Sequence, residues 1–305
     1  MNGMPSASAK QPSAAESSRG YHRVAVFDDC ERKYGFRYGM HLEAKRMAPA
    51  PALGSLLHIA LMHHYRARAG RDAEDPIEAM QNAPARIVHQ FAKALSIWES
   101  YLPWAAEADK AIEILDVERE FAARINGRLI TTRLDLVVAM HIDREHRVIA
   151  IDHKSTSAPL AVEIRRQGDT GQLALEDAIG RAVLPSTYGL PYGGTWVNAI
   201  STTGADPVAD RGPVHIEPEW SRAVRASLGI KLGRLEWVEM RPEWNLQAGV
   251  FNLPVSPDAC KGRFANGQCD YFRLCREGPS VLFSARSGFE VHVDEVTEMR
   301  EGSGV

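Results

Sequence analysis

The chain has 305 residues, of which 45% are hydrophobic and 25% charged, and its 36 basic and 39 acidic residues give a net charge of −3. This composition is typical of a globular protein with a sizeable core, in one large domain or two small ones. It excludes whole-molecule electrostatic attraction to nucleic acid, so any DNA contact must be local. No run of eighteen apolar residues predicts a membrane span and no apolar signal segment opens the chain, so we expect a cytoplasmic protein.

Residues 1–20 are rich in Ser, Ala and Gly without apolar periodicity, which predicts a flexible leader outside the fold. Apolar residues then recur at helical spacing over 53–70 and again over about 76–98. Two β-rich runs, 112–125 and 128–140, flank Asn126-Gly127, a dipeptide typical of a hairpin turn. Together with a third strand over 148–152, they predict a largely antiparallel meander.

The second half of the chain alternates between helical and strand patterns. Residues 171–184 predict a helix, 194–202 a strand and 218–240 a longer helix. This alternation indicates an α/β fold, in which a mixed central sheet is flanked by helices. The chain turns acidic beyond 285, so we expect one folded domain over 21–285 and an acidic tail over 286–305 that carries a short strand.

The stretch 148-VIAIDHKST-156 ends a strand with Asp152 and Lys154 on one face and His153 on the other. Asp135 lies on the preceding strand, with 16 residues between it and Asp152, and can face the pair. Two facing carboxylates repel each other unless a hard divalent cation such as Mg²⁺ lies between them. A water activated by that cation beside Lys154 could attack phosphorus. The alternative is an exposed strand-end ion pair that contributes little energy.

The runs 131-TTRLDLVV-138 and 149-IAIDHKST-156 resemble the RecB-like form of the PD-(D/E)XK nuclease superfamily, which commonly reads G-x-x-D followed by D-x-K-T/S. Thr132 stands where that family often has glycine. The resemblance implies a restriction-endonuclease-like core and cleavage of DNA with Mg²⁺ or Mn²⁺. It implies that Lys154 orients or activates the attacking water and stabilises charge at the phosphate. The implied metal ligands are Asp135, Asp152 and the backbone carbonyl of His153.

Two flanking helices carry further similarities to the same family. The sequence 54-GSLLH-58 resembles the upstream helix whose histidine completes the metal shell, which makes His58 a candidate ligand. The sequence 172-QLALEDA-178 resembles the family's Q-x-x-x-Y helix, so Gln172 is expected to support the site. Glu176 stands at the tyrosine position. For this residue an equally good interpretation is that Gln172 and Glu176 are two polar residues on a solvent-facing side of the helix. Upstream, either Glu118 or Glu120 could face the site, depending on the strand register.

The chain has four cysteines, one near the start and three spaced C-x8-C-x5-C near the end. In a cytosolic protein this count favours a metal or cluster over disulfides, and four thiolates suit either Zn²⁺ or an iron–sulfur cluster. The close C-x2-4-C pairs typical of zinc sites are absent from the sequence. Zinc and four unrelated buried cysteines stay as alternatives. The cysteines are Cys30, Cys260, Cys269 and Cys275.

The stretches 28-DDCERKYGFRY-38 and 254-PVSPDACKGRFANGQCDYFRLC-275 are similar to the terminal segments of iron–sulfur RecB-like exonucleases. That group includes the CRISPR-adaptation nuclease branch, the AddB nuclease domain and phage-encoded relatives, and the x8 spacing resembles the phage-type variants. The resemblance implies a structural [4Fe–4S] cluster that joins the N- and C-terminal parts of the domain.

Cations and aromatics interleave in the C-terminal cysteine segment, a composition able to bind single strands or to pack around a cluster. Cations on the helix predicted over 218–240 could follow phosphates, or form a solvated face. The candidate DNA contacts are Arg222, Arg225, Lys231, Arg234, Lys261, Arg263, Tyr271 and Arg273.

Taken together, these features predict a metal-dependent DNA exonuclease with a structural [4Fe–4S] cluster, acting on single-stranded DNA or DNA ends. Its context would be recombination, repair, phage DNA metabolism or CRISPR adaptation. One alternative is a non-catalytic DNA-binding subunit of a recombination or CRISPR-adaptation complex, and another is a zinc-stabilised nuclease. The sequence has no G-x-x-x-x-G-K-[ST] loop, so ATP-driven unwinding would require a helicase partner.

Overall fold

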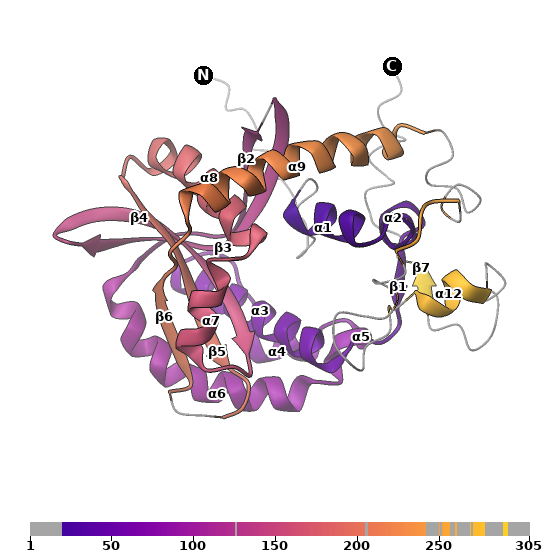
Figure 1. Cartoon of the computed structure of the whole chain (residues 1–305). Coiled ribbons are helices and arrows are strands. Elements are labelled where there is room, and N and C mark those ends of the chain that lie inside the picture. Colours follow the sequence, from indigo (N-terminus) through magenta and orange to yellow (C-terminus); the bar gives the residue numbers. More distant parts are fainter. Residues whose placement is uncertain are drawn as a thin grey trace, which may run out of the picture.

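The computed structural model describes residues 20–125, 127–204 and 207–241, together with 250, 252–256, 260, 269, 271–277 and 289–291. At its centre lies a five-stranded sheet in the order β2-β3-β4-β5-β6 (Figure 1). The strands are β2 (Glu113–Ile125), β3 (Arg128–Ile142), β4 (Glu145–Thr156), β5 (Tyr192–Ser201) and β6 (Ala209–Pro213).

The sheet is mixed. The first three strands pair antiparallel, as the sequence predicts, and Gly127 supplies a positive φ of 78° in the turn between β2 and β3. The chain then passes through α7 (Leu160–Gln167) and α8 (Gly171–Tyr188), so β5 runs parallel to β4. The last strand, β6, returns antiparallel to β5. The expected α/β fold with a mixed, helix-flanked sheet is therefore confirmed.

Two helical layers cover the sheet on opposite faces (Figure 1). One layer contains α3 (Pro49–Arg68), α4 (Pro76–Gln81), α5 (Ala85–Val88) and α6 (Phe91–Ala108), whose apolar side chains pack against Leu136, Val138, Ile149 and Ile151. The other contains α1 (Tyr21–Asp29), α8 and α9 (Pro218–Glu239), which pack against Val137, Val148 and Ala150. Alternate residues of β3 and β4 thus face alternate layers. Within the described part of the chain, no helix is both long and apolar enough to cross a bilayer.

The single helix expected over 76–98 is wrong. The chain instead forms α4, α5 and the first part of α6. Pro84 is the N-cap residue of α5, and a proline lacks the N–H that a continuing helix needs and restricts the residue before it. The predicted helix over 53–70 is present as α3, but it begins four residues earlier, at a proline in its first turn.

The two ends of the folded chain meet beside the main sheet. Strand β1 (Leu42–Ala44) pairs antiparallel with β7 (Phe289–Val291), a short strand within the region predicted to be an acidic tail. Nearby lie α2 (Glu31–Tyr34), the π-helix η1 (Gly35–Gly39) and α12 (Phe272–Glu277) (Figure 1). Cys269 and Cys275 pack against an apolar cluster that joins these elements. The cluster consists of the buried residues Phe36, Leu42, Val250, Tyr271 and Leu274.

Candidate metal and nuclease site

The site forms where β3 and β4 separate. The last paired residues of the two strands are Leu136 and Ile151. Just beyond this pair, the N–H of His153 on β4 donates to Asp135 Oδ2 on β3 at 2.8 Å. Asp135 therefore lies beside the next peptide of β4, close to Asp152. Asp152 is only 3% exposed, so the exposed strand-end ion pair considered from the sequence is wrong.

Lys154 and Gln172 hold the Asp152 carboxylate from two sides. The ammonium of Lys154 lies 3.0 and 2.9 Å from the two carboxylate oxygens of Asp152. Gln172, in the first turn of α8, donates to Asp152 Oδ1 at 3.2 Å and to Glu176 Oε1 at 2.9 Å. Glu176 is 4% exposed, so this is no solvated helix face. The structure thus brings together the D-x-K pair and the predicted helix.

His58 reaches the same site from α3. Its Nε2 lies 2.8 Å from the carbonyl oxygen of His153, and its Nδ1 lies 3.5 Å from Asp135 Oδ2. A carbonyl oxygen can only accept, so Nε2 carries the hydrogen, and in the neutral ring the lone pair of Nδ1 faces Asp135. Donation by one ring nitrogen to a backbone carbonyl is typical of a histidine that binds metal through the other. The carbonyl of His153, a predicted ligand, here accepts from His58.

Glu118 completes a cluster that the sequence left undecided. Ligand atoms of His58, Glu118 and Asp135 all lie within 4.8 Å of one another, whereas the side chain of Glu120 is exposed. Glu118 has a left-handed φ of 51°, which is rare for a residue inside a strand and often marks a functional position. At this residue β2 changes face: Val117 packs in the α3 layer and Phe121 in the α8 layer.

The carboxyl groups of the site have perturbed pKa values. Burial, reinforced by Asp135, raises the pKa of Glu118 to about 8, although Arg133 and Arg66 oppose the change. Burial and Asp135 also raise the pKa of Asp152 against the effect of Lys154. For Asp135 the effect of burial is outweighed by His58, His153 and Lys154 and by the hydrogen bond from the His153 N–H, so the pKa of Asp135 falls.

The pKa values of Lys154 and Glu176 are also set by burial and by neighbouring charges. Burial lowers the pKa of Lys154, but the carboxylates of Asp152, Glu176 and Asp135 outweigh it and raise that pKa. Burial and Asp152 raise the pKa of Glu176 well above its usual value. Four carboxyl groups thus share the site with one ammonium. A divalent cation would offset their repulsion, and the oxygen and imidazole donors fit Mg²⁺ or Mn²⁺.

A glycine lets α3 approach the strand that carries the catalytic motif. A Cβ atom on Gly54 would lie 3.1 Å from Ser155 Oγ, which is tighter than ordinary van der Waals contact. Gly54 is one helical turn before His58, and residues four apart lie on the same helix face. The small residue in 54-GSLLH-58 therefore sets the distance between α3 and β4, and through it the position of His58.

We expect Gly54→Val to lower both Mn²⁺ affinity and activity. The branched side chain must displace α3 from β4, which moves His58 away from Asp135 and costs about 1–3 kcal/mol of stability. Calorimetric Mn²⁺ titration and thermal unfolding measure the two effects. The double variant Gly54→Val with Ser155→Ala should recover part of the lost affinity, because the atom nearest to the new side chain is removed. Equal affinities for Gly54→Val and the wild type would contradict this account of the glycine.

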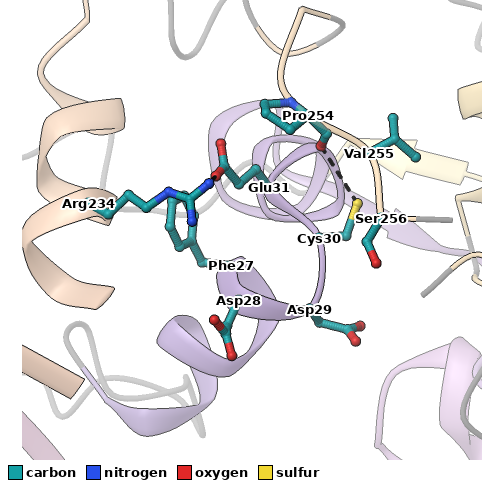
Figure 2. Close-up of a pocket in the computed structure, with 9 residues that line it drawn as sticks. All are labelled: Phe27, Asp28, Asp29, Cys30, Glu31, Arg234, Pro254, Val255 and Ser256. Atoms are coloured by element: carbon teal, nitrogen blue, oxygen red, sulfur yellow. Dashed lines mark hydrogen bonds and ion pairs between the residues drawn. The ribbon is translucent and has the colours of Figure 1, made fainter. Parts of the chain in front are cut away.

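The four cysteines lie in the region where the chain ends meet. Cys30 is buried between α1 and α2, and its Sγ lies 4.0 Å from the carbonyl oxygen of Pro254 beside a cavity of about 130 Å³ (Figure 2). Burial raises the pKa of the Cys260, Cys269 and Cys275 thiols, and Cys30 adds to the increase in each of the three. Each of these thiols therefore lies within electrostatic reach of Cys30.

The predicted DNA contacts on α9 have partners within the protein. Arg222 pairs with Glu219, Lys231 lies 2.6 Å from Asp28, Arg234 pairs with Glu31 (Figure 2), and Arg225 donates to the Ser221 carbonyl. Tyr271 is 5% exposed and donates to the Leu42 carbonyl, so it packs in the core and does not stack on bases. Lys261, Arg263 and the side chain of Arg273 lie outside the described residues.

Two other arginines lie near the metal-ligand cluster and were not identified from the sequence. Arg133 on β3 and Arg66 on α3 both act electrostatically on Glu118. Arg133 precedes Asp135 by two positions on the strand, and its Nε is buried without a hydrogen-bond partner among the described residues. Strand alternation could have indicated Arg133, whereas the place of Arg66 depends on how α3 packs.

These features define the class: an α/β protein whose central strands carry a carboxylate–lysine cluster suited to a divalent cation. A family model for the PD-(D/E)XK nuclease superfamily matches residues 21–276. The chain therefore belongs to the PD-(D/E)XK nuclease superfamily, whose members are generally metal-dependent phosphodiesterases. The resemblance inferred from 131-TTRLDLVV-138 and 149-IAIDHKST-156 is thereby confirmed at the level of the superfamily.

Two solved structures are similar to the chain at low sequence identity. One, described as a "putative exonuclease" from Eubacterium rectale, has 10% identity and a TM-score of 0.46, with 92% of each chain covered. The other, SSO0001, has 12% identity and a TM-score of 0.29 and covers 59% of this chain and 73% of its own. The comparison with curated proteins gives no match.

Proposed function

We propose that this protein is a metal-dependent DNA exonuclease that hydrolyses phosphodiester bonds of single-stranded DNA or DNA ends. The observation that carries the proposal is the convergence of His58, Glu118 and Asp135 within 4.8 Å, next to the Asp152–Lys154 pair. Mg²⁺ or Mn²⁺ bound there would neutralise the phosphate and activate water. Membership of the superfamily supports hydrolysis, while the exonucleolytic mode rests on the RecB-like motifs.

Different residues of the site would have different roles in the reaction. His58, Glu118, Asp135 and Asp152 offer the ligand atoms for the cation. Lys154 is held against Asp152, from where its charge can stabilise the negative charge that develops on the phosphate and orient the attacking water. Gln172 fixes this arrangement, because its amide spans Asp152 and Glu176 while its oxygen lies 3.5 Å from Lys154 Nζ.

Arg133 and Arg66 are suited to hold a phosphate next to the scissile one. We expect Arg133→Gln to raise KM for single-stranded DNA about tenfold with little change in kcat, because a phosphate contact outside the reacting centre acts on binding. The slope of log affinity against log salt should fall by about 0.7. Steady-state kinetics at several salt concentrations measure both. Arg124→Gln, at the exposed hairpin end of the same sheet, is the control and should change neither; an unaltered KM for Arg133→Gln would remove this phosphate contact.

The cysteine region is suited to a [4Fe–4S] cluster. Cys30, Cys260, Cys269 and Cys275 come from both ends of the domain, and Cys30 contributes to the raised pKa of each of the other three thiols. A cationic cluster core would remove this repulsion, as thiolate ligation generally does. We propose that these four residues hold the cluster and that it joins the chain ends. Zn²⁺ is the competing occupant, distinguished by colour and metal analysis.

The first test is purification without oxygen, followed by a visible spectrum and an assay with Mn²⁺ and end-labelled single-stranded DNA. A brown protein that absorbs broadly near ~400 nm and degrades DNA until EDTA is added is the expected result. Shortening from a labelled end, without internal fragments, would establish the exonucleolytic mode. A colourless protein that cleaves DNA would support the proposed nuclease function and favour zinc over an iron–sulfur cluster at the cysteines.

A protein that binds DNA without cleaving it would favour the alternative, a non-catalytic subunit of a recombination or CRISPR-adaptation complex. The buried Asp152–Lys154 pair and the His58–Glu118–Asp135 cluster argue against that alternative. A scaffold has no physical need for several repelling carboxyl groups in one site. In either case a helicase partner would have to supply unwinding.

A further inference from the structure

His153 contributes both of its backbone groups to the metal site. Its N–H donates to Asp135 Oδ2 at 2.8 Å, and its carbonyl accepts from His58 Nε2 at 2.8 Å. Two candidate ligands on different elements, β3 and α3, are therefore located by the backbone of a single residue. A movement of His153 would displace both ligands together.

The side chain of His153 lies on the other face of the sheet and is 3% exposed. Its ring is parallel to that of Tyr65, with centroids 5.5 Å apart and an angle of 6°, and meets the His58 ring edge-on at 6.1 Å. Its Nδ1 lies 2.9 Å from Asn198 Nδ2. Tyr65 and His58 both belong to α3, so the imidazole packs against the helix that carries a candidate ligand.

A buried set of polar side chains holds Asn198 in place. Asn198 is fully buried on β5, and its amide nitrogen also donates to Tyr101 Oη at 3.0 Å. The Tyr101 and Tyr65 hydroxyls lie 2.9 Å apart, and Arg211 donates to Tyr65 Oη at 2.8 Å. Arg211 is in turn paired with the buried Asp109 at 2.7 Å. We call Tyr65, Tyr101, Asp109, Asn198 and Arg211 the buried polar network.

Stability alone does not account for an imidazole at position 153. Because the amide of Asn198 donates to Nδ1, the neutral ring carries its hydrogen on Nε2. That Nε2 is buried without a hydrogen-bond partner among the described residues, which costs free energy. Apolar side chains at both positions 153 and 198 would fill the same space without this cost. What the imidazole adds is a directional hydrogen bond that fixes the ring relative to β5.

We propose that His153 is a positioning residue, and that the buried polar network fixes its side chain so that its N–H and carbonyl hold Asp135 and His58 in ligand geometry. The inference rests on the proposed metal-dependent nuclease function. It extends that function to residues that touch neither the cation nor DNA. The network spans α3, α6, the short 3-10 helix η2 (Asp109–Ala111), β5 and β6, and it contacts His153 on β4, so the ligand geometry depends on how the α3–α6 layer packs against the sheet.

Asn198→Ala tests the proposal because it removes the donor to His153 without altering the site. Mn²⁺ binding is measured in the absence of DNA by electron paramagnetic resonance, and kcat and KM are measured on single-stranded DNA. We expect Mn²⁺ affinity to fall roughly 10–100-fold, as for other residues that support metal ligands. We expect kcat to fall with little change in KM for DNA.

A matched control separates positioning from general destabilisation. Ile200 lies two residues along the same strand, on the same face, and is 1% exposed. Ile200→Ala should lower Tm by opening a cavity and leave Mn²⁺ affinity unchanged. If Asn198→Ala does not fold, Tyr101→Phe removes only the hydroxyl that orients Asn198, and a several-fold loss of Mn²⁺ affinity is expected.

A double-mutant cycle decides whether His153 and Asn198 act through each other. His153→Ala keeps the backbone groups, and its effect on Mn²⁺ affinity should not add to that of Asn198→Ala. Additive effects, or lowered Tm values with Mn²⁺ affinity as in the wild type, would overturn the proposal while leaving the nuclease intact. A wild-type protein that binds no Mn²⁺ and cleaves no DNA would overturn the proposed function, and with it this role.

Discussion

Asp152→Asn should reduce DNA cleavage at least about a thousandfold while leaving the protein as stable as the wild type. The carboxylate of Asp152 is held by Lys154 and Gln172 at the point where β4 leaves β3, next to Asp135. An amide of the same shape cannot supply an anionic ligand, so binding of the cation and activation of water are both lost. Single-turnover kinetics with excess enzyme and Mn²⁺ measure the loss directly.

The stability part of this prediction follows from the charges around Asp152. Burial and Asp135 raise its pKa, which means that the ionised form is disfavoured where it lies. Asparagine removes that cost, and Glu176 remains near Lys154 as a charge partner. We therefore expect an unfolding temperature equal to or above that of the wild type. This opposite response of activity and stability is typical of residues selected for catalysis.

Asp143→Asn is a matched control for this substitution. Asp143 lies in the exposed turn between β3 and β4 with a positive φ of 49°, a conformation that asparagine adopts readily. It is the same chemical change at the far end of the same strand pair, and both activity and stability should be unaffected. Retention of cleavage by Asp152→Asn would place the cation elsewhere and contradict the site.

The parts of the site that the sequence predicts are those governed by local rules. Strand alternation places Asp152 and Lys154 on one face, and the structure joins them at 2.9 Å. The Asn126-Gly127 pair predicts the hairpin, and Gly127 has the positive φ that such a turn needs. These features depend on neighbours within a few residues, so they are readable before the fold is known.

The parts that could not be predicted depend on tertiary structure or on an unsignalled backbone conformation. The choice between Glu118 and Glu120 is decided by a left-handed φ at Glu118, which nothing in its residue type announces. The contact of Asn198 with His153 joins residues on two different strands that are 45 positions apart in sequence. Tertiary packing also decides which basic side chains are paired with acidic groups of the protein, as those of α9 are.

The cysteine site allows a second prediction with a large effect. Cys269 lies outside any regular element of the described chain, and its N–H meets the Cys260 carbonyl at 3.4 Å while its carbonyl accepts from Phe272 at 2.9 Å. Among the described residues, Cys269 packs against an apolar cluster of five buried side chains that joins the two chain ends. A cluster held by Cys30 and the three later cysteines would cross-link the same segments covalently.

Cys269→Ala should therefore lose the brown colour and most of the about four iron atoms expected per chain. Loss of the cross-link between the chain ends should lower Tm by on the order of 10 °C, because metal binding and folding are coupled at such sites. Val255→Ala, in the same cavity as Cys30 but without a ligand atom, should keep iron and stability. Asp152→Asn should keep the iron as well, which separates the two sites. A Cys269→Ala protein with wild-type iron content would exclude this residue as a ligand, and one that is colourless yet equally stable would show that the chain ends are held by packing.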